Sequence, residues 1–300
     1  MGPMTHLSDI AAAVKGLPRK RMAVAYGEDV HTLQAVQRAV REGIVDAVVV
    51  GSAAKIAEVA SASDVNTSLF EIMDVQGELP SVKAAVKLVR DGSAHMLMKG
   101  LAHTDNYMRG ILDKQNGLLP EGGLLSHVAV FEAPNYPRLI IVSDVAVVPL
   151  PSLQDKVRIT KLTVGVVHSL RIDVPKVAFL SASESVLKFA SSQEAAVLAG
   201  MAVRKQFGAI IGEGPISIDC ALFPDACQVK GFMGRIQGDA DIIIVPNIES
   251  GNVFYKVLCR FGSGEVAAMV TGTTAPCILA SRGDSEDSKF YSIALGALNA

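Results

Sequence analysis

Residues 21–51, RMAVAYGEDVHTLQAVQRAVREGIVDAVVVG, hold the pattern that decides the fold of this chain. Residues 21–26 are mostly apolar and indicate a buried strand, and Asp29 then stands where a helix cap is expected. The helix that follows has apolar residues at helical spacing and ends at Gly43. A second apolar strand fills 46–50. This order of strand, helix and strand predicts a parallel βαβ unit.

The alternation continues outward from this unit. Further strands are expected at 68–75, 95–98, 176–181, 209–212, 241–245, 265–270 and 277–280, and further helices at 52–60, 81–90, 152–171, 192–206, 219–230 and 250–261. The runs 126–133 and 138–143 flank a Pro-Asn-Tyr-Pro turn and predict an antiparallel pair. We therefore expect an α/β fold made of two α/β lobes with a cleft between them. The first lobe is assigned to 1–120 plus 276–300, and the second to 121–275.

Composition excludes several classes of function. The formal net charge of -2 in 300 residues gives no electrostatic basis for binding nucleic acid or an anionic membrane. The four cysteines have neither CxxC metal spacing nor the pattern of a secreted disulfide framework, so no metal site is expected. No secretory signal opens the sequence, and its apolar stretches are too short for a bilayer. A cytoplasmic protein is the expectation.

The C-terminal stretch TGTTAPCILASRGDSEDS, residues 271–288, carries the most concentrated polar chemistry. The apolar run 277–280 breaks into Ser281-Arg282-Gly283-Asp284, and Ser285 opens a helix that also carries Asp287. Open α/β sheets bind ligands at the carboxyl ends of their strands, and helix N-termini attract anions. The residue types predict chemistry on a phosphate or carboxylate. A charged surface turn is the alternative for this segment taken alone.

A second turn of this kind runs from Lys99 through Gly100 to His103, and Thr104 then opens a helix that carries Arg109. Glycine allows the backbone to approach a ligand, and a guanidinium can grip an oxyanion with two hydrogen bonds. Solvated charges that bind nothing are the alternative for the lysine and the arginine.

A third turn, Glu249-Ser250-Gly251-Asn252, follows an apolar strand and starts another helix. It can be a helix cap alone. Three polar, glycine-containing turns in one chain favour a shared anion-binding site to which Asn252 contributes. No Walker, GxGxxG or GxSxG motif is present to suggest another site.

Several segments together resemble the phosphate acetyltransferase and phosphate butyryltransferase family, in order and over nearly the whole length. They are GEDVHTLQAVQRAVREGIVDAVVVG, MKGLAHT followed by MRGIL, GGLLSHVAVFEAP, DVPKVAFLSASE, GEGPISIDCALFPDA, DADIIIVPNIESGNVFYKVL and SRGDSEDSKFYSIAL. The short length, LLSHV and the Ser-Arg-Gly-Asp-Ser turn are closer to the butyryl branch. His103 and Gly283 are closer to the acetyl branch.

The resemblance implies reversible transfer of a short acyl group between coenzyme A and inorganic phosphate. Acyl-CoA, phosphate and acyl phosphate would be the partners, with coenzyme A as a substrate and no tightly bound cofactor. It also implies a fold like that of isocitrate and isopropylmalate dehydrogenases, with a homodimer or higher oligomer formed through the second lobe.

The resemblance further implies that Ser281-Arg282 and Arg109 line the site. A family aspartate at the start of the last helix acts as the base for the thiol, and its position is held here by Ser288. Asp287 lies one residue earlier and Asp284 lies in the turn itself. Both stay candidates, and Asp284 is preferred because it shares the turn with the serine and arginine.

Three alternative functions stay open at this point. They are a phosphate acetyltransferase, a catalytically weak protein that binds acyl-CoA or acyl phosphate, and an oxidoreductase on the same fold. The metal-binding carboxylates of decarboxylating dehydrogenases are not apparent in the sequence, which counts against the last alternative.

Overall fold

The computed structural model describes residues 2–134, 136–280 and 283–300. The chain forms two compact units. One consists of Leu7–Leu125 with Glu265–Ala300, and the other of the segment up to His6 with Ser126–Gly264. We call them the terminal unit and the central unit, after the parts of the sequence from which they are built.

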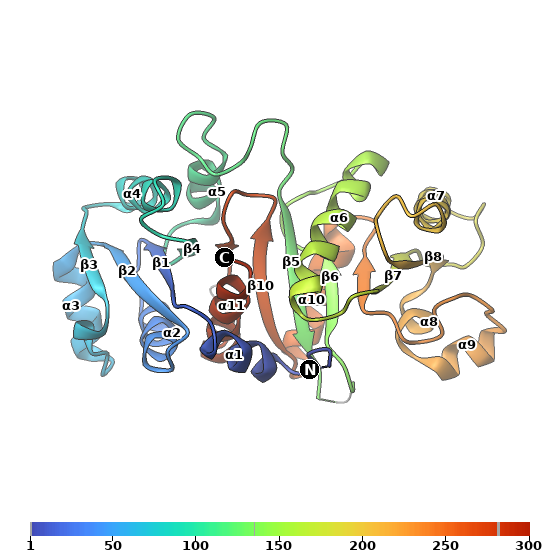
Figure 1. Cartoon of the computed structure of the whole chain (residues 1–300), viewed down its shortest axis with the longest axis horizontal. Helices are drawn as coiled ribbons and strands as arrows, with labels where there is room; N and C mark the ends of the chain where they lie inside the picture. The colour runs from blue at the N-terminus through green and yellow to red at the C-terminus, as the bar shows by residue number, and fades with distance from the viewer. Residues whose placement is uncertain (1, 135, 281–282) are drawn as a thin grey trace. The chain divides into compact units, whose positions relative to one another are not determined.

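The terminal unit combines the N-terminal strands with the last two strands of the chain. Its strands are β1 (Lys20–Ala25), β2 (Val45–Gly51), β3 (Glu71–Asp74), β4 (Met96–Lys99), β10 (Glu265–Thr271) and β11 (Cys277–Ile278). They lie in the order β3-β2-β1-β4-β11-β10, all neighbours being parallel except β10 and β11. Figure 1 shows the red C-terminal elements beside the blue and cyan ones within this unit.

Helices of the terminal unit form two contacting groups. They are α1 (Leu7–Lys15), α2 (Val30–Arg41), α3 (Ala53–Ala62), the 3-10 turn η1 (Thr67–Leu69), α4 (Glu78–Arg90), α5 (Thr104–Leu112) and α11 (Glu286–Leu298). Helix α11 packs on β10 and contacts α1 and α2, whereas α4 crosses β1, β2 and β4 and contacts α5. The strands between them are therefore mostly apolar, and the last four residues of β1 are all buried.

The central unit carries the antiparallel pair. Its strands are β5 (Ser126–Glu132), β6 (Ile140–Ser143), β7 (Lys176–Leu180), β8 (Ile211–Ile216) and β9 (Ile242–Ile244), and its helices are α6 (Leu153–Ser169), α7 (Ala190–Val203), α8 (Ile218–Leu222), α9 (Pro224–Lys230) and α10 (Ile248–Arg260). The strand order is β5-β6-β9-β7-β8. The predicted pairing of 126–133 with 138–143 is confirmed, and the remaining neighbours are parallel.

The structure differs from the expectations at two places. The helix predicted at 219–230 is two helices, α8 and α9, because Pro224 has no N–H to donate and begins a new helix instead. Helix α1 was not predicted, although Leu7, Ile10, Ala11 and Val14 recur at helical spacing and are buried.

The predicted α/β class is confirmed, with parallel and antiparallel neighbours in its sheet. No helix within the described parts of the chain has the length and apolar character to cross a membrane.

Candidate functional site

Three strands of the terminal unit end side by side. Ala25 at the end of β1 is opposite Lys99 at the end of β4, and Met98 is opposite Ile278 of β11. Because the three strands are parallel, the turns that follow them lie at one carboxyl edge of the sheet, where α/β proteins bind ligands. The sequence predicted site residues in two of these turns, after β4 and after β11.

Lys99 is buried and holds the turn after β4. The residue is only 5% exposed. Its Nζ donates hydrogen bonds to the carbonyl oxygens of Gly100, at 3.1 Å, and Ala102, at 3.0 Å. A buried ammonium group is stable only where such acceptors replace water. Lys99 therefore shapes the turn and places a positive charge beneath it.

Gly100 allows the turn after β4 to lie against the turn after β1. A Cβ at this position would lie 2.4 Å from the carbonyl oxygen of Tyr26 and 2.9 Å from Cα of Gly27. Two backbone hydrogen bonds join the turns here, from Gly100 N–H to Ala25 at 2.9 Å and from Leu101 N–H to Tyr26 at 2.8 Å. The glycine is needed for this close approach of backbones.

His103 and Thr104 mark the start of α5. Glu78, at the start of α4, accepts hydrogen bonds from the backbone N–H of His103 at 2.7 Å and from Asn106 at 2.8 Å, and its other oxygen lies 2.9 Å from His103 Nδ1. Burial acts to raise the pKa of Glu78, but these hydrogen bonds outweigh it and lower the pKa. The imidazole is 69% exposed and Thr104 is exposed, so both face solvent at a helix start.

Tyr107 of α5 ties β4 to β11. Its hydroxyl is buried and donates to the carbonyl oxygen of Ile278 at 3.0 Å, with that of Leu97 at 3.4 Å. Desolvation raises the pKa of this phenol well above its usual value, so it stays a neutral donor. The helix that carries Arg109 is thereby fixed to the strand that precedes the second predicted turn.

Arg109 is exposed and borders a hollow of about 730 Å³ between α4 and α5. Three further cations share the lining of this hollow, namely Lys83, Lys87 and Arg90. Its floor includes the apolar side chains of Val82 and Val86. The arrangement offers Arg109 to an anion from a surface where positive charge prevails.

Asp284 follows β11 and precedes α11. Ser281 and Arg282, the two other catalytic candidates of this turn, lie outside the described residues. Asp284 is half-buried, and its backbone carbonyl oxygen accepts a hydrogen bond of 3.0 Å from Nζ of Lys289. The structure therefore places the buried ammonium of Lys289 against the backbone of Asp284 at the start of the last helix.

Asp287 lies in the first turn of α11 and is exposed. Its carboxylate pairs with the Arg38 guanidinium of α2 at 2.5 Å. The same guanidinium stacks on the Phe290 ring, 4.1 Å from its centroid. Burial acts to lower the pKa of Arg38, and the hydrogen bonds to Asp287 and Glu42 outweigh it and raise that pKa. These contacts give Asp287 a structural role in joining two helices.

Ser285 is the N-cap of α11, as the sequence predicted, and accepts from the N–H of Ser288 at 3.0 Å. The hydroxyls of Ser285 and Ser288 both donate to one carboxylate oxygen of Glu265 in β10, at 2.7 and 2.6 Å. Ser288 also accepts from the N–H of Val266 at 3.2 Å. The position at which the resembling family carries an acidic residue is thus turned inward and hydrogen-bonded to the sheet.

Asn252 belongs to the central unit. It lies on α10, and its side-chain amide donates to the carbonyl oxygen of Val145 at 3.2 Å. The cap of this helix is Asn247, whose side chain accepts from Ser250 N–H at 2.9 Å. The sequence allowed residues 249–252 to be a helix cap, but in the structure Asn247 caps this helix.

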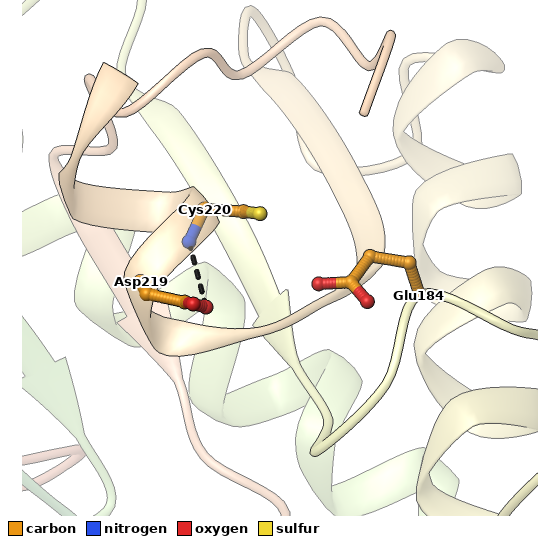
Figure 2. A group of neighbouring side chains, drawn as sticks. All are labelled: Glu184, Asp219 and Cys220. Carbon is orange, nitrogen blue, oxygen red and sulfur yellow. Dashed lines mark hydrogen bonds between the residues drawn. The ribbon is translucent and has the colours of Figure 1, made fainter. Parts of the chain in front are cut away.

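Glu184, Asp219 and Cys220 form the single group with metal-ligand atoms in mutual reach among the residues that the structure describes. Figure 2 shows Asp219 and Cys220 on α8 facing Glu184 from the loop after β7. The ammonium of Lys230 donates to Asp219 at 2.9 Å and to Glu184 at 3.3 Å. Hydrogen bonds with Ser217 and Lys230 lower the pKa of Asp219 to about 2. A lysine side chain thus supplies the cation that these carboxylates face.

The turn after β1 also lies at this edge, and it was not among the turns that the sequence predicted to form the site. It comprises Tyr26, Gly27, Glu28 and Asp29. Glu28 is buried and accepts from Ser52 N–H at 2.8 Å, and Asp29 caps α2 through Thr32 N–H at 2.9 Å. The signal was present, because this turn also places glycine and acidic residues directly after an apolar strand.

Comparisons with known proteins give one consistent result. The model of the family described as phosphate acetyl/butaryl transferase matches residues 6–81 and 79–297. Phosphate butyryltransferase of Clostridium beijerinckii is 39% identical over 294 residues, which cover 98% of this chain and 97% of that protein. Phosphate acetyltransferase of Thermotoga maritima is 36% identical over 280 residues, which cover 93% and 95%.

A solved structure agrees. The branched-chain phosphotransacylase from Enterococcus faecalis V583 is 30% identical and superposes with a TM-score of 0.82 over 93% of this chain and 98% of that one. The residues matched by the family model, 6–81 and 79–297, include the ends of β1, β4 and β11.

Proposed function

Since this chain belongs to the phosphate acetyl/butaryl transferase family, we propose that it transfers a short acyl group reversibly between coenzyme A and inorganic phosphate. The observation that carries the proposal is the 39% identity to a phosphate butyryltransferase along 98% of the chain. That similarity favours the butyryl branch over the acetyl branch, whose example is 36% identical.

In the proposed reaction a phosphate oxygen attacks the carbonyl carbon of acyl-CoA. A C–O bond forms, the C–S bond breaks, and the thiolate of coenzyme A leaves and takes up a proton. The reverse reaction needs the thiol deprotonated before it attacks the acyl phosphate. A thiol pKa of about 8.5 means that a positioned carboxylate need give only modest help.

We assign the anion-binding part of this chemistry to the carboxyl edge of the terminal unit. Arg109 and Arg282 hold the phosphate, and Ser281 donates a hydrogen bond to the carbonyl oxygen, on which negative charge builds. Lys99 and Gly100 support this assignment by shaping the turn beside it, and Lys99 adds buried positive charge. His103, Thr104 and Asn252 are proposed as substrate contacts.

We assign the base to Asp284. Its place in the turn after β11, at the start of α11, supports this choice. Asp287, the other candidate, is engaged with Arg38 on the side of α2.

Acyl-CoA, phosphate and acyl phosphate are then the partners, with coenzyme A as substrate and no tightly bound cofactor. We further propose two lobes, at 1–120 plus 276–300 and at 121–275, which correspond to the two compact units apart from residues 1–6, 121–125 and 265–275. Their architecture would be that of isocitrate and isopropylmalate dehydrogenases, with a homodimer formed by the second lobe in the cytoplasm. The α/β sheets in both units support this part of the proposal.

The decisive experiment mixes the purified protein with butyryl-CoA or acetyl-CoA and phosphate, and follows release of free thiol. We expect release that requires phosphate, persists in EDTA and is faster with butyryl-CoA. Thiol release that ignores phosphate would identify a hydrolase. No turnover with any short acyl-CoA, accompanied by binding, would identify a binding protein and refute the proposal.

Arg109→Ala tests the site in the same assay. Losing a charged contact to phosphate should lower kcat/KM for phosphate by about 10- to 100-fold. Arg41→Ala, an exposed arginine in the last turn of α2, is the matched control and should leave the kinetics unchanged. Equal kinetics in the two variants would remove Arg109 from the site.

A further inference from the structure

Lys289 is a buried cation for which the reaction described above has no use. It lies in the first turns of α11 and is 5% exposed. A positive charge near the N-terminus of a helix is unfavourable, because the helix dipole is positive there. Burial adds a desolvation penalty, which lowers the pKa of this lysine. A lysine at such a position needs a compensating interaction.

The start of α11 does not depend on Lys289. Ser285 caps the helix, and the hydroxyls of Ser285 and Ser288 bind Glu265 of the neighbouring strand. The Asp287–Arg38 pair joins the helix to α2. These contacts account for the position of the helix without the lysine.

The groups that face Lys289 come from two turns of the carboxyl edge. Its Nζ donates to the backbone oxygen of Asp284 at 3.0 Å, and the carboxylates of Asp284 and Asp29 both act on its charge. Asp29 belongs to the turn after β1, where Oδ1 caps α2 through Thr32 N–H. The other oxygen, Oδ2, is buried and has no hydrogen-bond partner within the described residues. The buried ammonium of Lys289 is thus influenced by two acidic turn residues that are 255 positions apart by residue number.

We propose that Lys289 is a positioning residue for acyl transfer, and that its ammonium fixes Asp284 at the carboxyl edge of β11. The inference rests on the proposed function, because it concerns the residue to which we assign the base. The hydrogen bond to the carbonyl oxygen of Asp284 holds the backbone of the turn. A charged donor makes this hydrogen bond stronger than a neutral one would. Lys289 does not itself touch the substrate.

Three substitutions separate charge from packing. Lys289→Met keeps a long side chain without charge or donor, Lys289→Gln keeps a donor without charge, and Lys289→Arg keeps both. Lys161→Met removes an exposed lysine of α6 and is the control. For each protein, kcat and the KM for phosphate and butyryl-CoA are measured, together with the urea midpoint.

We expect kcat to fall by roughly 10- to 100-fold in Lys289→Met and by a smaller factor, still above about threefold, in Lys289→Gln. Both KM values should stay within about threefold of wild type. Lys289→Arg should recover most of kcat, and Lys161→Met should match wild type. A lysine that only filled space would instead change the urea midpoint and leave kcat of the folded protein intact.

If Lys289→Met does not fold, Lys289→Gln carries the test, and a kcat within threefold of wild type overturns the inference. The same holds if Lys289→Arg loses as much of kcat as Lys289→Met. Wild-type protein that shows no phosphate-dependent turnover refutes the proposed function itself, which distinguishes the two failures.

Discussion

Replacing Gly100 with alanine should damage the terminal unit more than its single added carbon suggests. The new Cβ would lie 2.4 Å from the carbonyl oxygen of Tyr26 and 2.9 Å from Cα of Gly27. Ordinary contacts of this kind begin near 3.4 Å, so the turns must separate by about 1 Å. Both neighbours are backbone, and no side-chain rotation can relieve the overlap.

The cost follows from what joins the two turns. A shift of about 1 Å breaks or weakens the hydrogen bonds from Gly100 to Ala25 and from Leu101 to Tyr26, at about 0.5–1.5 kcal/mol each. Strain from overpacking adds about 1–3 kcal/mol. We therefore expect Gly100→Ala to lower the free energy of unfolding by about 2–6 kcal/mol. A displacement of this size at a substrate-binding turn should lower kcat/KM by about 100-fold.

Urea unfolding followed by circular dichroism measures the first effect, and the thiol-release assay measures the second. Gly165→Ala is the matched control. This glycine lies within α6 and an added Cβ would meet nothing within 4 Å, so alanine should stabilise the helix by up to about 1 kcal/mol. The reasoning is refuted if Gly100→Ala unfolds within about 1 kcal/mol of wild type and keeps its kcat/KM.

Two further predictions concern carboxylates. Asp284→Asn should lower kcat far more than Asp287→Asn, since Asp287 is committed to an ion pair between helices, and equal losses at saturating substrate would contradict this. Hydrogen bonds from Ser217 and Lys230 hold the pKa of Asp219 at about 2 in the folded protein, against about 3.9 in the unfolded chain. The ionised carboxylate should therefore stabilise the fold at pH values above about 3.9, and this contribution should be lost as the pH falls toward 2. Urea midpoints of wild type and Asp219→Asn should therefore differ at neutral pH and converge in acid, and a constant difference would exclude the carboxylate's charge as the cause.

Local patterns predicted most of the fold. The parallel unit of residues 21–51 and the antiparallel pair of 126–133 with 138–143 are confirmed, because apolar strands and turn residues give strong local signals. Helix 219–230 failed where a proline began a new helix within an otherwise helical pattern. Helix α1 could have been predicted from its apolar spacing alone.

The candidate site was less accessible to such reasoning. Lysines are usually solvated, so nothing local indicated that Lys99 and Lys289 are buried and bind backbone carbonyls. The pairing of Asp287 with Arg38 spans 249 residues and depends on how α11 packs on α2. Sequence spacing identifies strand-end turns, whereas the tertiary structure determines which of their charges face inward.

The terminal unit is built from both ends of the sequence, so during synthesis it is completed after the central unit. The central unit has all of its residues once Gly264 is made, whereas the terminal unit still lacks β10, β11 and α11. Since α11 is buried along most of its length, the earlier strands and helices keep an uncovered apolar surface until the last residues arrive. A chain that stops early therefore lacks both the turn after β11 and the helix that covers the core, so incomplete products stay unfolded in this unit and open to proteolysis.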